Sequence, residues 1–167
     1  MSAHDLKQLE NDIKLLRDQL AGKRKVSVLI APEEQVRIDQ QIVELRKKIR
    51  IFEQEKWQLI AEMTADLAIA DDEAEVIIAE IVTEGKAIAA TPPDGVSPEI
   101  LTLLQKIITK LNEPSKPAAA KLKGAISALP PFVSLTYEAE LDTESAFQSY
   151  FPTFNRVRKG LIDRLKK

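Results

Sequence analysis

The sequence predicts an all-α protein in which a long antiparallel coiled-coil hairpin (residues 1–62) precedes a small helical bundle (residues 63–167). Two stretches near the N-terminus repeat apolar residues at alternating three- and four-residue spacing. Helix start and stop signals follow one another through the rest of the chain. Only one short stretch, at residues 132–141, has the alternation of a strand, and the chain ends in a basic helix.

The hairpin is predicted from two heptad seams. The first seam contains Leu6, Leu9, Ile13, Leu16 and Leu20, and the second contains Ile38, Ile42, Leu45, Ile49 and Phe52. If the chain reverses near residue 29, Leu20 faces Ile38 and Leu6 faces Phe52 at the two ends of five apolar layers. The next layer outward would then be polar, with Lys23 against Gln35.

The first helix is expected to run from Ala3 to Lys23, because Gly22 and the basic residues 23–25 suit a helix C-terminus. The tip would then be residues 26–31. Four of its residues are apolar: Val26, Val28, Leu29 and Ile30. Either they fold back and cap the end of the coil, or they contact a partner, since exposed apolar clusters mark contacts.

The second helix is expected to begin at Pro32, with Glu33 and Glu34 at the positive end of the helix dipole. Its apolar content continues past Phe52, where the first helix has no residues left to face it. We therefore expect this helix to enter the rest of the protein. Trp57 would be a structural anchor at the junction.

The bundle is expected to contain helices at residues 73–90, 97–111, 115–128, 142–150 and 153–166. Asp71 and Asp72 are candidate caps of the first of these helices. Ser97 followed by Pro98 is a strong start for the second, because serine caps a helix and proline favours the first position.

The stretch from Val133 to Leu141 alternates apolar and polar residues with a period of two, which favours a strand. A lone strand leaves its backbone groups unpaired. The segment could lie extended along the helices, pair with residues 25–30, or exchange with another copy of the chain. The candidate pairing residues are Val133, Leu135 and Tyr137.

The residue inventory gives no candidate catalytic, cofactor-binding or metal-binding residue. The chain has no cysteine and one histidine, His4, so thiolate sites and a serine-histidine-aspartate triad are not expected. Neither a signal-peptide pattern nor a run of 18 apolar residues is present, which favours a cytoplasmic protein. We therefore do not expect an enzyme.

The charges are distributed unevenly. Residues 1–62 carry a net charge of +1, residues 63–101 carry −8 and residues 102–167 carry +5. The acidic and basic parts could pair within the fold or between copies. Arg156, Arg158, Lys159 and Arg164 on the last helix are candidate contacts for an anionic surface, such as lipid headgroups. No nucleic-acid motif accompanies them, so nucleic acid is not an expected partner.

Two stretches carry a resemblance. Residues 16–55, with their leucine-rich first helix, proline-containing tip and polar heptad return helix, resemble the coiled-coil hairpins beside bacterial signalling and conflict-system NTPases. Residues 122–160 resemble a helical adaptor or effector-associated segment of such systems. The resemblance implies a stand-alone partner or effector, because the chain has no NTPase, caspase-like or TIR-like domain.

The sequence thus predicts a non-enzymatic protein–protein interaction or adaptor module that self-associates as a homo-oligomer in a bacterial signalling or defence assembly. The alternative is a membrane-active helical effector, in which the helices of residues 74–128 rearrange and the basic last helix meets anionic lipid.

Overall fold

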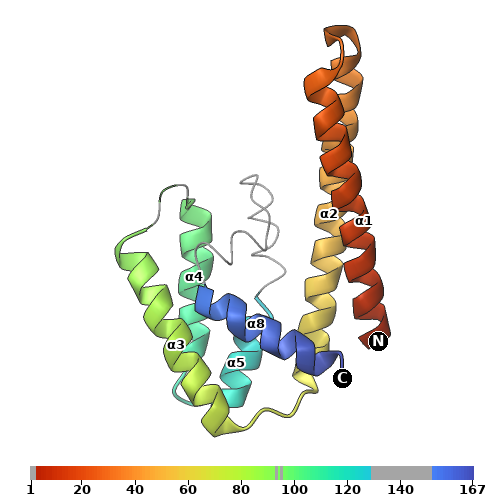
Figure 1. Ribbon diagram of the computed structural model, residues 1–167. Helices are drawn as coiled ribbons and strands as arrows, with labels where there is room; N and C mark the ends of the chain where they lie inside the picture. The colour runs from red at the N-terminus through yellow and green to blue at the C-terminus, as the bar shows by residue number, and fades with distance from the viewer. Residues whose placement is uncertain (1–2, 93, 95, 129–151) are drawn as a thin grey trace.

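The computed structural model describes residues 3–92, 94, 96–128 and 152–167. In this part of the chain all the regular structure is helical, which confirms the all-α prediction (Figure 1). The described helices are α1 (Ala3–Leu29), α2 (Pro32–Ala65), α3 (Asp71–Ala90), α4 (Pro98–Leu111), α5 (Ala118–Ile126) and α8 (Pro152–Leu165). The predicted strand, including Val133, Leu135 and Tyr137, and the helix predicted at residues 142–150 lie outside the described residues.

Helix α1 ends six residues later than predicted, at Leu29 rather than Lys23. Gly22 lies inside the helix and does not end it. Two side-chain contacts to α2 account for the extra length: Lys23 Nζ donates to Gln41 Oε1 at 2.8 Å, and Ser27 Oγ donates to Asp39 Oδ1 at 2.7 Å. Polar layers thus continue the pairing beyond the apolar seam, and only two residues, 30 and 31, reverse the chain.

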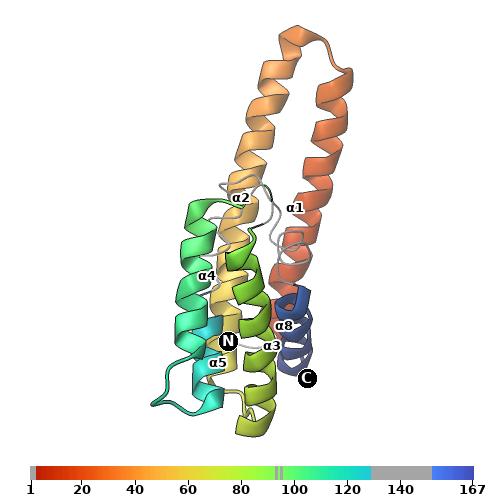
Figure 2. The ribbon, with the colours of Figure 1, turned by 90° about the vertical axis from the view of Figure 1, so that its left-hand side faces the viewer.

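Helices α1 and α2 lie side by side and run in opposite directions, as both views show (Figures 1 and 2). Their register differs from the predicted one. Lys23 meets Gln41, not Gln35, and Leu6 packs in a cluster with Trp57 and Ile60 rather than with the cluster that holds Phe52. The partners on α2 lie about one heptad further along. A shift of one heptad keeps the apolar positions facing each other, so the sequence pattern alone cannot exclude it.

A small apolar cluster joins the middle of α1 to α2. Leu16, Leu20 and Ile49 are buried there, and Ile42, Leu45 and Phe52 pack against them. These are all seam residues of the heptad pattern. Their burial holds the two helices together above the larger core.

The larger core takes residues from all six described helices. Leu6 of α1 and Trp57, Leu59 and Ile60 of α2 belong to the same buried cluster as the apolar faces of α3, α4, α5 and α8. Trp57 is 1% exposed, which agrees with its predicted role as an anchor. The predicted boundary at residue 62 lies within α2, whose last turns belong to this core.

The bundle helices begin close to their predicted positions, with one correction. Ser97 caps α4, and its hydroxyl accepts a hydrogen bond from the Ile100 amide at 3.3 Å. Asp71 and Asp72 do not cap α3 as predicted, because they lie in its first turn and Ala70 is the N-cap residue. Asp71 Oδ1 instead accepts from the Ala119 amide at the start of α5, at 3.1 Å.

Candidate interaction surface

The tip of the α1–α2 pair, defined here as residues 26–36, exposes apolar side chains. Val28 is 83% exposed and Leu29 is 85% exposed, while Val26 is 45% exposed. Ile30 is partly buried, and Val36 on the second turn of α2 is 64% exposed. Of the two interpretations offered by the sequence, the apolar residues do not fold back as a cap. The last turn of α1 stays helical and turns them outward.

Exposed large apolar residues are concentrated on these two helices. In the described part of the chain they are Leu15, Val26, Val28, Leu29, Val36, Val43 and Ile51 on the α1–α2 pair, and Val76 on α3. Scattered exposed apolar residues are ordinary on a protein surface, but a contiguous group is a feature of contact sites. Four of these eight described residues belong to the tip: Val26, Val28, Leu29 and Val36.

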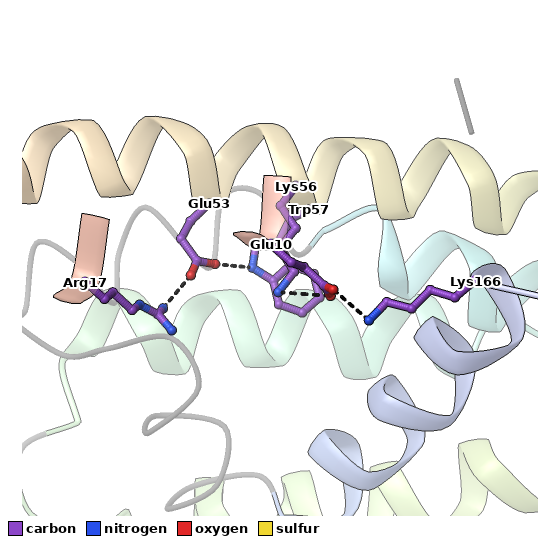
Figure 3. Close-up of polar contacts among 6 residues, drawn as sticks. All are labelled: Glu10, Arg17, Glu53, Lys56, Trp57 and Lys166. Carbon is purple, nitrogen blue, oxygen red and sulfur yellow. Dashed lines mark hydrogen bonds and ion pairs between the residues drawn. The ribbon is translucent and has the colours of Figure 1, made fainter. Parts of the chain in front are cut away.

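A buried polar cluster holds the lower part of the α1–α2 pair (Figure 3). Glu53 of α2 is 2% exposed, and its carboxylate accepts from two groups. One is the Arg17 guanidinium of α1, and the other is the Trp57 indole Nε1–H at 3.1 Å. A carboxylate this deeply buried needs such partners, because desolvation of an unpaired charge is costly. The cluster therefore fixes α1 against α2 next to the core.

A second polar cluster connects the pair to the C-terminal helix (Figure 3). Glu10 of α1 lies between two lysines: Lys166 Nζ is 2.6 Å from its Oε2, and Lys56 Nζ is 3.8 Å from its Oε1. Lys56 Nζ also lies 5.3 Å from the centre of the Trp57 ring. Together, the two clusters connect α1, α2 and the residue after α8 to one another, away from the tip.

Two of the candidate anionic-surface residues on α8, Arg156 and Arg164, take part in internal ion pairs. Arg156 Nη2 is 2.7 Å from Glu80 Oε2, and Arg164 Nη1 is 3.2 Å from Glu73 Oε1. Arg164 also donates to the Ala68 carbonyl at 2.9 Å. The acidic α3 and the basic α8 thus pair within the fold, which is one of the two arrangements that the charge distribution suggested.

The two other candidate cations, Lys159 and Arg158, also belong to α8. Lys159 also has an interaction within the protein. Arg158 belongs to α8, but its side chain is outside the described part.

A surface groove of about 840 Å³ runs along α2 near the tip, and it is open to solvent and lined mainly by charged and amide side chains. No group of three or more histidine, aspartate or glutamate residues suited to a metal ion occurs in the described ranges. Within the same ranges, none of the helices combines the length and apolar content needed to cross a lipid bilayer.

No family model, curated protein or solved structure matches this chain. The resemblance of residues 16–55 and 122–160 to modules of bacterial signalling systems therefore stays a hypothesis.

The sequence indicated most of the tip but not its full extent. Val26, Val28 and Leu29 were predicted as contact residues and are exposed. Val36 was missed, because a single valine in a polar helix start carries no signal of its own. Glu53 was also missed; the available signal was its spacing of four residues from Trp57, which places a carboxylate and an indole N–H on one helix face.

Proposed function

We propose that this protein is a non-enzymatic protein-interaction module whose α1–α2 pair is a coiled-coil hairpin that presents its tip to a protein partner. One observation carries the proposal: Val28 and Leu29, at the end of α1, are 83% and 85% exposed. Neighbouring apolar side chains that are exposed together are typical of contact sites.

The way the base is held supports the same function. Arg17, Glu53 and Trp57 lock the pair on its inner side, and Lys166 holds α1 through Glu10. A tip that presents a binding surface benefits from such a fixed base, because binding then requires less loss of conformational freedom. Helices α3, α4, α5 and α8 pack against the α1–α2 pair in the larger core and anchor it. The adaptor role, and membership of a bacterial signalling or defence assembly, are parts of this proposal.

Site-specific photo-crosslinking tests the proposal. A benzophenone amino acid replaces Leu29 in the full-length chain, which is expressed in the cells that normally make it. The matched control places the same residue at Leu15, which lies on the same helix and is also exposed, at 61%, but is remote from the tip. We expect protein adducts from position 29 and far fewer from position 15.

Loss of the apolar surface should remove those adducts. In a Val28→Glu variant that carries the photoreactive residue at position 29, crosslinking should fall at least about tenfold, because a charge at a contact centre must be desolvated. Circular dichroism should show an unchanged helix content, since position 28 is exposed. Equal crosslinking from positions 29 and 15, or no protein adduct at either, would refute the proposed function.

A further inference from the structure

The flanks of the tip carry opposite charges on its two helices. Arg24 and Lys25 are exposed on α1, just before Val26. Glu33 and Glu34 are exposed on α2, just before Val36, and Glu34 also pairs with Arg37 at 3.7 Å. The exposed residues Val26, Val28 and Leu29, called here the apolar centre, therefore have a basic side and an acidic side.

The basic side is not explained by the stability of α1 itself. Cations stabilise the C-terminal end of a helix chiefly within its last turn. The last turn of α1 contains no basic residue, because α1 continues to Leu29. Glu33 and Glu34, by contrast, lie in the first turn of α2 and interact favourably with its dipole. Arg24 and Lys25 thus form a charged surface that the fold does not require.

We propose that the partner of the tip is a second copy of this chain, and that two tips meet about a two-fold axis that sets α1 of one copy against α2 of the other. This inference rests on the proposed function and names its partner. A two-fold interface requires a surface that is complementary to itself. An apolar centre between a basic and an acidic flank has this property.

The charges also select one arrangement among the possible two-fold pairings. When α1 faces the partner's α2, Arg24 and Lys25 meet Glu33 and Glu34 of the partner subunit at both ends of the interface. When α1 faces the partner's α1, the basic flanks oppose each other, as do the acidic flanks. Like charges brought together disfavour an interface, and opposite charges favour it and set its register.

The fold leaves room for such a contact. Figure 2 shows the tip extending beyond the other described helices, so a second tip can approach without meeting the rest of either molecule. The apolar centre contains only valine and leucine side chains and has no aromatic anchor. Interfaces of this small size are weak and transient, so we expect a dissociation constant on the order of 100 μM.

Sedimentation velocity on the full-length chain, from about 10 μM to 1 mM, tests this inference with three charge variants. The first is Arg24→Glu with Lys25→Glu, and the second is Glu33→Lys with Glu34→Lys. The third combines all four substitutions, so that the flank on α1 is acidic and the flank on α2 is basic. We expect the wild type to dimerise and each of the first two variants to weaken the dimer at least about tenfold. The combined variant should regain the wild-type affinity.

The recovery in the combined variant separates lost contact from lost folding. An unchanged dimer in the first variant would overturn the inference, because an arrangement of α1 against α1 predicts no loss there. A wild-type protein that stays monomeric at 1 mM would also overturn it. In that case adducts from position 29 to a different protein would leave the proposed function intact, whereas the absence of any adduct would remove both.

Discussion

Replacing Arg17 by methionine should show how strongly the buried carboxylate of Glu53 depends on its cation. Methionine keeps the apolar stem of the side chain but leaves Glu53, at 2% exposure, with the indole N–H of Trp57 and without the guanidinium. Removing one partner of a fully buried ion pair costs about 3–5 kcal/mol. Because the Arg17 side chain is 34% exposed, solvent already screens part of this interaction. We expect a loss of about 2 kcal/mol.

Urea unfolding, followed by circular dichroism and by the fluorescence of the single tryptophan, measures this loss. With a slope of about 2 kcal/mol per molar urea, the midpoint should fall by about 1 M. Arg156→Met is the matched control, because the Arg156 side chain is 70% exposed and its pair with Glu80 lies at the surface. That control should cost less than about 0.5 kcal/mol.

A double-mutant cycle then isolates the electrostatic part. Glu53→Gln keeps one acceptor oxygen, for the Trp57 indole, and places an NH2 group where the other oxygen accepted from Arg17. Because the Arg17 side chain is 34% exposed and can turn to solvent, we expect a cost of about 1 kcal/mol. Once position 53 is neutral, Arg17→Met should add little, so the double variant should also lose about 1 kcal/mol. Additive costs in the double variant, or equal midpoints for Arg17→Met and Arg156→Met, would refute the role assigned to this pair.

Three further predictions concern Gly85, Thr64 and Ser97, and each is measured as a change in the urea midpoint. Gly85→Ala places a methyl group 2.9 Å from Ile108 Cδ1, so it should leave the protein about 2 kcal/mol less stable than Gly22→Ala, whose new methyl group meets no atom within 4 Å. Comparable stability of the two alanine variants would contradict this reading. The buried Thr64 hydroxyl has no hydrogen-bond partner in the described part of the chain. Thr64→Val should therefore stabilise the protein by about 1 kcal/mol, whereas Thr64→Ser, which keeps the hydroxyl and removes a methyl group, should destabilise it. Ser97→Ala should cost about 1 kcal/mol through loss of the α4 cap, and an unchanged midpoint would argue against that cap.

The sequence predicted the helices well where local signals are strong. Proline at the first position located the starts of α2 and α4, and heptad spacing identified the buried seam residues. The end of α1 was predicted wrongly, because Gly22 followed by three basic residues has the composition of a helix end. The tertiary contacts of Lys23 and Ser27 with α2 outweighed that local preference.

Register and buried charge were harder to predict, for different physical reasons. A heptad pattern is nearly unchanged by a shift of seven residues, so it determines which faces meet but not which layers. Only the length of the connection, two residues here, selects the register. The burial of Glu53 depends on Arg17, which lies 36 residues away in the sequence, and no local pattern reports such a pairing.

The ion pair between Glu10 and Lys166 has a practical consequence for engineering this chain. It connects the N-terminal half of α1 to the residue after α8, and Figure 1 shows the start of α1 and the end of α8 near each other, away from the tip. With 27 residues, α1 is about 40 Å long. A short peptide could therefore join the two termini, and a circular permutant could open the chain at residues 30 and 31. In such a permutant α1 and α2 would be held together by their side chains alone, with no covalent connection at the tip.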